Sequence, residues 1–81
     1  MRLFYKAVNF ATGKTITGFF IDPDLVKGNM LTFTEIGYGL YYLDIELSKC
    51  GPHCGKFFEG GKPTLAHVFR KGEHPGIINY A

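Results

Sequence analysis

The residues best able to do chemistry lie in one short run, Cys-Gly-Pro-His-Cys, which contains Cys50, His53 and Cys54. Two thiols and an imidazole are groups that zinc accepts in tetrahedral geometry. His67 and His74 could supply further ligands. No second Cys or His pair follows closely, however, and the spacing is wider than the usual Cys-x-x-Cys. A small zinc module centred on this run is therefore kept as the alternative function.

The same run has two other interpretations. A hairpin with a three-residue Gly-Pro-His loop would place Cys50 opposite Cys54 at a Cα separation compatible with a disulfide. In a reducing compartment the two side chains would instead remain thiols that only pack. A cysteine nucleophile needs a base and an orienting group, and nothing in the sequence places His53 or His67 beside a thiolate. The sequence therefore predicts neither an enzyme nor a cofactor.

Three other motifs have structural explanations. Asp22 and Asp24 could bind calcium, but a turn containing Pro23 explains both carboxylates. The glycines at 37, 39, 60 and 61 fit no nucleotide-binding pattern, because no strand-loop-helix unit surrounds them. His67 lies on the apolar face of its expected strand, so we expect a hydrogen-bonded histidine in the core or at its rim.

The length and composition indicate one small domain. Eighty-one residues leave apolar surface for one core, so the domain is expected to span 1–81. A hydrophobic share of 46% and a charged share of 20% are ordinary for globular proteins, which indicates that the chain folds. Eight Phe and five Tyr predict a core built on aromatic rings.

Charge and hydropathy argue against two classes of partner. A net charge of +2 is too small for the basic field that phosphate-backbone binding needs, so no nucleic-acid partner is expected. No run approaches the ~18 apolar residues of a spanning helix, and Lys6 interrupts the apolar start before a signal-peptide core could form. We expect a soluble protein with no membrane partner.

Turn signals divide the chain into short strands. Asp22-Pro23-Asp24 ends a strand, and 23–29 is compatible with a helical turn. The tail 71–81 is expected to be mobile or to add a short edge strand at 77–80. Three hairpins are predicted, pairing 2–10 with 15–21, 31–36 with 40–47 around Gly37-Tyr38-Gly39, and 56–59 with 64–70 around 60–63.

The clearest periodicity is the alternation over 40–47, which is typical of a half-buried strand. On the last predicted strand, Leu65, His67 and Phe69 share a face. Six or seven short strands without a helical period predict an all-β fold, namely a small antiparallel β-sandwich, with a small β-barrel as the alternative. In 40–47 one face carries Tyr41, Leu43, Ile45 and Leu47, and the other carries Tyr42, Asp44 and Glu46.

Three aromatic doublets exceed what one core can bury. Adjacent strand residues face opposite sides, so a two-layer sandwich buries one ring of each doublet. The outward rings either cover loops, rims and the tail, or form a contact patch for self-association or docking. The doublets are Phe19-Phe20, Tyr41-Tyr42 and Phe57-Phe58, and these six residues are the predicted interaction surface.

The stretch 31–44, with Thr-Glu-Ile-Gly-Tyr-Gly-Leu-Tyr at its centre, resembles segments of small immunoglobulin-like β-sandwich modules in tailed-phage and prophage virion proteins. The segments 12–17 and 57–61 are similar in style to the same modules, whereas the Cys-Gly-Pro-His-Cys run is not part of the pattern. The resemblance implies an immunoglobulin-like fold and a structural role in a virion.

These observations together predict a non-enzymatic structural or docking module that acts through protein-protein contacts. It would form a homo-oligomer or join a larger assembly, using its outward rings and any unpaired edge strand. Its expected location is the virion if the resemblance holds, and the cytoplasm otherwise.

Overall fold

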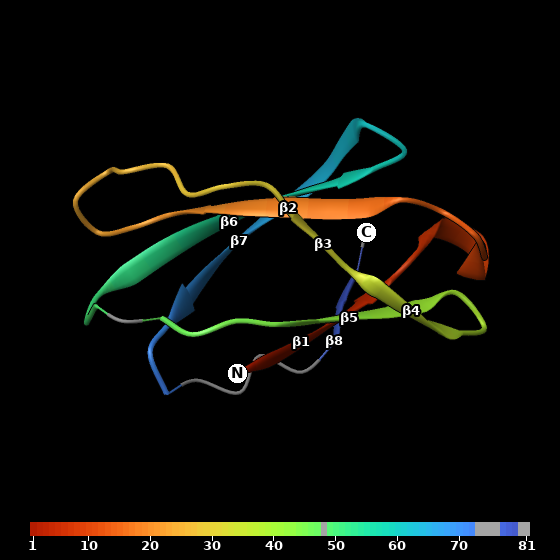
Figure 1. Ribbon diagram of the computed structural model, residues 1–81, viewed down its shortest axis with the longest axis horizontal. Helices are drawn as coiled ribbons and strands as arrows, with labels where there is room; N and C mark the ends of the chain where they lie inside the picture. The colour runs from red at the N-terminus through yellow and green to blue at the C-terminus, as the bar shows by residue number, and fades with distance from the viewer. Residues whose placement is uncertain (48, 73–76, 80–81) are drawn as a thin grey trace.

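The computed structural model describes residues 1–47, 49–72 and 77–79, which form a two-layer β-sandwich (Figure 1). The predicted all-β sandwich is confirmed, with eight strands in the described residues instead of six or seven. In chain order the elements are β1 (Arg2–Lys6), the 3-10 helix η1 (Val8–Phe10), β2 (Ile16–Ile21), β3 (Leu31–Thr32), β4 (Thr34–Gly37), β5 (Leu40–Asp44), β6 (Pro52–Glu59), β7 (Lys62–Arg70) and β8 (Ile77–Asn79).

The strands form two separate sheets, which excludes the barrel alternative. One sheet, called sheet A here, has the order β4-β5-β1-β8, and the other, sheet B, has the order β3-β2-β6-β7. Neighbouring strands are antiparallel except β1 and β8, which run parallel. The edge strand expected in the tail is thus present at Ile77–Asn79, while 73–76 and 80–81 lie outside the described residues.

The predicted first hairpin, between 2–10 and 15–21, is wrong. β1 pairs with β5 in sheet A, and β2 pairs with β6 in sheet B. Between them, η1 and the loop after it carry the chain from one sheet to the other (Figure 1). Tyr5 and Ile16 are both fully buried, so each strand contributes to the core from its own layer.

The other two hairpins are confirmed as β4–β5 and β6–β7. The expected strand 31–36 is divided at Phe33, where the chain crosses from β3 in sheet B to β4 in sheet A. Phe33 is 5% exposed, and its amide donates to the carbonyl of Ile16 at 2.8 Å. Residues 23–29 form a turn instead of a helix, closed by the amide of Leu25 donating to the carbonyl of Asp22.

The alternation predicted for 40–47 is confirmed, although β5 ends at Asp44. Tyr41 is 1% exposed, and Leu43, Ile45 and Leu47 pack against the core. Asp44 and Glu46 are exposed. The side-chain pattern therefore continues for three residues beyond the last ladder pair.

Each aromatic doublet divides between core and surface, as the two-layer geometry requires. Tyr41 and Phe57 are buried in the core cluster, and Phe20 packs against that cluster. Their neighbours in the sequence point to the opposite faces of the same strands. The outward rings are those of Phe19, Tyr42 and Phe58.

The core is a set of rings arranged around Phe57. Its ring centre lies 5.8 Å from that of Phe33, 5.9 Å from that of Phe20 and 6.1 Å from that of Phe69, all with steep angles between the ring planes. Edge-to-face contacts of this kind are favoured by the ring quadrupole. The Phe57 ring thus joins side chains from β2, β6, β7 and the β3–β4 crossing.

Two strand glycines make room for this ring. A Cβ at Gly18 would lie 2.7 Å from the Phe57 ring, and a Cβ at Gly55 would lie 2.8 Å from it and 2.9 Å from the Phe69 ring. Gly18 is the register partner of Phe57, and Gly55 is the partner of Phe20. The rings therefore occupy the space that the side chains of ordinary strand residues would fill.

Gly55→Ala should lower the free energy of unfolding by about 1–3 kcal/mol, because the new methyl group overlaps the Phe57 and Phe69 rings. Urea unfolding followed by circular dichroism measures the change. Lys56→Ala, at the exposed neighbouring position, is the matched control and should change stability by less than about 0.5 kcal/mol. Equal stability of the Gly55→Ala variant and the wild type would contradict this packing.

Candidate functional site

The structure does not form the hairpin predicted for the Cys-Gly-Pro-His-Cys run. β6 begins at Pro52, and Cys54 pairs with Val68 on β7 and Ile21 on β2 instead of facing Cys50. Cys50 is exposed, Cys54 is half-buried, and both are free thiols. The hypothesis of a disulfide across a three-residue loop is therefore wrong for this structure.

The proposed zinc ligands also point apart. His53 is 5% exposed and faces the interior, whereas Cys54 is the next residue on the strand and faces outward. His67 is exposed at the rim of the core, with its ring centre 4.7 Å from that of Phe69. His74 lies outside the described residues. Within 1–47, 49–72 and 77–79, no three His, Cys, Asp or Glu side chains are placed to hold a metal ion.

Asp22 organises the turn that follows β2. Its Oδ1 accepts hydrogen bonds from the amides of Asp24 and Val26, both at 2.9 Å, and its Oδ2 accepts one from Lys49 Nζ at 3.0 Å. The backbone hydrogen bond from Val26, followed by the bond from Lys49, lowers the pKa of Asp22 below its usual value. Both oxygens of Asp22 therefore have hydrogen-bond partners, and the turn explains this residue as expected from the sequence.

The doublet rings do not form the open patch that the sequence predicts. Phe20, Tyr41 and Phe57 belong to the interior and are excluded as contact residues. Phe19 is only 9% exposed, because it stacks on Phe58 at 5.9 Å and Lys27 Nζ lies 4.6 Å from its ring centre.

Tyr42, the outward ring of sheet A, is covered in a similar way. The guanidinium carbon of Arg2 lies 4.5 Å from the centre of its ring. Arg2 is held there by two hydrogen bonds to the carboxylate of Asp44, at 2.8 and 2.9 Å. Two of the three outward doublet rings, Phe19 and Tyr42, thus each have a cation over the ring.

The more exposed rings lie at one end of the sandwich, on η1 and the β4–β5 hairpin. Phe10 is 57% exposed and Tyr38 is 87% exposed. The two segments touch, because a Cβ at Gly39 would collide with the Phe10 backbone and the amide of Ala7 donates to the carbonyl of Gly39. Val8 at 38% and Ile36 at 54% complete this surface, and we call the four side chains Val8, Phe10, Ile36 and Tyr38 the aromatic tip.

Hydrogen bonds hold the loop between η1 and β2 to sheet A. The hydroxyl of Tyr41 donates to the carbonyl of Ala11 at 2.9 Å and accepts from the amide of Lys14 at 3.1 Å. The amide of Gly13 donates to Glu35 Oε1 at 2.8 Å. The backbone that follows Phe10 is therefore fastened to the two strands that carry Tyr38.

Both aromatic residues of the tip, Phe10 and Tyr38, have a backbone conformation with positive φ. Phe10 has a φ of 53° and Tyr38 a φ of 58°, in the left-handed region that bulky residues rarely adopt. Such conformations raise the free energy by about 1–3 kcal/mol and persist where the surroundings enforce them. The packing against Gly39 and the Tyr41 hydrogen bonds are those surroundings.

Sequence reasoning interpreted Gly37-Tyr38-Gly39 only as a turn and placed Phe10 within a strand. One signal was available, because a large ring between two glycines at a hairpin end has no neighbour to bury it. The exposure of Phe10 could not be inferred, because it depends on the chain leaving sheet A at Ala7. An exposed apolar cluster without a chemically reactive group suits contact with another protein.

Among the described residues, no helix is long and apolar enough to cross a membrane. Comparison with known proteins found no family model, curated protein or solved structure that matches this chain. The resemblance to virion modules therefore stays a prediction.

The Asp22 carboxylate should make the stability sensitive to acid. A pKa lower in the folded than in the unfolded chain stabilises the fold above the ordinary value of 3.8, and this contribution is lost as the pH falls through the native pKa. Unfolding free energies measured between pH 7 and pH 2 should therefore fall less steeply at the acidic end for Asp22→Asn than for the wild type. Asp24→Asn is the control, because it keeps both backbone hydrogen bonds of Asp22. Parallel curves for Asp22→Asn and the wild type would contradict the assignment.

Proposed function

We propose that this protein is a non-enzymatic docking module that associates with a second copy of itself through the aromatic tip. The observation that carries the proposal is that two exposed rings, Phe10 and Tyr38, lie on segments of constrained backbone that contact each other at Gly39. Large rings buried at protein contacts contribute much of the binding free energy. Exposed rings at a fixed position are therefore the feature that best fits a contact site.

The rigidity of the tip favours association. Each aromatic side chain can bury roughly 150–250 Å², and the free energy gained is reduced by the entropy lost when side chains and loops become ordered. Here the loop after Phe10 is already fixed by the hydroxyl of Tyr41, and Lys6 Nζ lies 4.7 Å from the centre of the Phe10 ring. The Phe10 ring and the backbone around it are thus positioned before any partner binds.

A second copy is the partner that the tip fits. A two-fold contact uses the same surface on both subunits, so it needs two unlike features that complement each other. Tyr38, the most exposed ring, can pack on Phe10 of the partner copy, while Lys6 approaches the Phe10 ring within its own subunit. Four side chains form a small contact, so we expect a dissociation constant on the order of 10–100 µM.

The resemblance to immunoglobulin-like virion modules supports the same proposal, because such a module would act through repeated protein contacts. A virion component is therefore the cellular role that we propose for the assembly. Among residues 1–47, 49–72 and 77–79, no contact favours the zinc alternative over this one.

Sedimentation velocity from 10 µM to 1 mM tests the self-association. The wild type should show a sedimentation coefficient that rises with concentration, whereas Tyr38→Ser should remain monomeric because the most exposed ring is lost. Leu25→Ser is the matched control, since Leu25 is 85% exposed and also has a positive φ, of 64°, but lies in the loop after β2. It should associate like the wild type.

Two results would contradict the proposal. One is a wild type that remains strictly monomeric at 1 mM. The other is association that Leu25→Ser weakens as much as Tyr38→Ser does, because this would place the contact outside the tip.

A further inference from the structure

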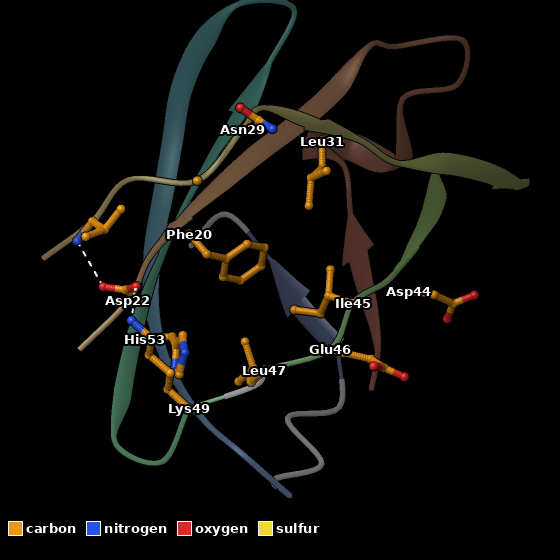
Figure 2. A pocket seen from close by; sticks show the side chains of 12 residues that line it. Phe20, Asp22, Asn29, Leu31, Asp44, Ile45, Glu46, Leu47, Lys49 and His53 are labelled. Carbon is orange, nitrogen blue, oxygen red and sulfur yellow. Dashed lines mark hydrogen bonds and ion pairs between the residues drawn. The ribbon is translucent and has the colours of Figure 1, made fainter. Parts of the chain in front are cut away.

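A cavity borders the loop after β2. This loop and the β4–β5 hairpin lie at opposite ends of the sandwich (Figure 1). Its volume is about 400 Å³, within the range of roughly 300–1,000 Å³ that is typical of small-molecule sites. Figure 2 shows four apolar side chains that converge on this space from segments of both layers. They are Phe20, Leu31, Ile45 and Leu47.

His53 is the polar group that is buried at this cavity. The side chain lines the cavity and is only 5% exposed. Its Nδ1 lies 3.2 Å from the carbonyl oxygen of Gly51, and because a carbonyl oxygen only accepts hydrogen bonds, this contact is a hydrogen bond in the tautomer that carries its proton on Nδ1. In that tautomer Nε2 is an acceptor, and no hydrogen bond to it occurs among the described residues. Nε2 is therefore available to a ligand.

Most of the charged groups near the cavity are already engaged in ion pairs. Lys49 Nζ lies 3.0 Å from Asp22 Oδ2 and 2.7 Å from Asp24 Oδ2. Asp44 pairs with Arg2 at 2.8 Å, and in Figure 2 both Asp44 and Glu46 point away from the Phe20 ring. A charged ligand would have to compete with these pairs, whereas a neutral one would not.

We propose that this cavity binds a small neutral molecule that has an apolar body and a hydroxyl group. The apolar body lies against Phe20, Leu31 and Leu47, and the hydroxyl donates a hydrogen bond to His53 Nε2. Burial of the apolar body provides most of the affinity, and the hydrogen bond provides the selectivity. This site is separate from the aromatic tip, so neither inference depends on the other.

The test uses two probes of the same shape, 4-ethylphenol and ethylbenzene, titrated into the ¹⁵N-labelled full chain and followed by NMR. 4-Ethylphenol should bind in the millimolar range or tighter and shift the amides of Phe20, Leu31, Ile45 and His53. Ethylbenzene should shift the same amides with about tenfold weaker affinity, because it cannot donate to His53.

Two variants separate the hydrogen bond from the cavity. His53→Phe removes the acceptor and keeps an apolar wall, so both probes should bind with equal affinity. Leu31→Trp replaces a side chain that is 37% exposed and fills the cavity, so both probes should lose binding. Leu25→Trp, outside the cavity, is the matched control and should bind both probes like the wild type. If His53→Phe does not fold, the comparison of the two probes on the wild type still tests the hydrogen bond. Leu31→Trp still tests whether the probes bind in the cavity.

The proposal would be overturned if 4-ethylphenol and ethylbenzene bind the wild type equally, or if neither binds at its limit of solubility. It would also be overturned if the shifts fall outside the residues that line the cavity, or if Leu31→Trp binds as the wild type does.

Discussion

The ring of Phe57 fits between the two sheets only because Gly18 and Gly55 have no side chains there. Phe57 joins β6 to Phe20 on β2, to Phe69 on β7 and to Phe33 at the crossing between the sheets. A chain of 81 residues has little apolar surface for a core, and large rings laid over bare backbone bury more of it per residue. The spacing of the two layers depends on this packing.

Both ends of the sandwich depend on the same arrangement. At one end, Tyr41 places its ring in the core and its hydroxyl on the loop after η1, so the packing also positions the exposed rings of Phe10 and Tyr38. At the other end, the Phe20 ring packs against the Phe57 ring and also lines the cavity together with His53. The aromatic tip and the cavity thus both depend on one aromatic core.

The sequence predicted those parts of the fold that local patterns determine. The alternation around Tyr41 identified the inward face of β5, and the glycine turns identified the hairpins β4–β5 and β6–β7. The first hairpin was predicted wrongly, because a turn signal near Gly13 cannot distinguish a tight hairpin from a chain that crosses to the other layer. The same limit applies at Phe33, where one run of strand formers serves both sheets.

The candidate sites were harder to predict than the fold. The doublets indicated a surplus of rings, but which rings stay exposed depends on cations that come from distant positions, such as Lys27 over Phe19 and Arg2 over Tyr42. The Cys-Gly-Pro-His-Cys run suggested a metal or a disulfide, but the ladder of β6 turns His53 and Cys54 to opposite faces. The exposure of each ring and the directions of His53 and Cys54 depend on the register between strands that are far apart in the sequence.

Self-association through the aromatic tip, as proposed above, is tested best by mapping the contact residue by residue. ¹H–¹⁵N spectra of the wild type recorded at increasing protein concentration locate the amides whose environment changes on association. Chemical shifts should change only for residues 8–11 and 36–39, and the amides of sheet B should stay unchanged. Shifts centred on Phe19 and Phe58, or spectra that do not change with concentration, would contradict it.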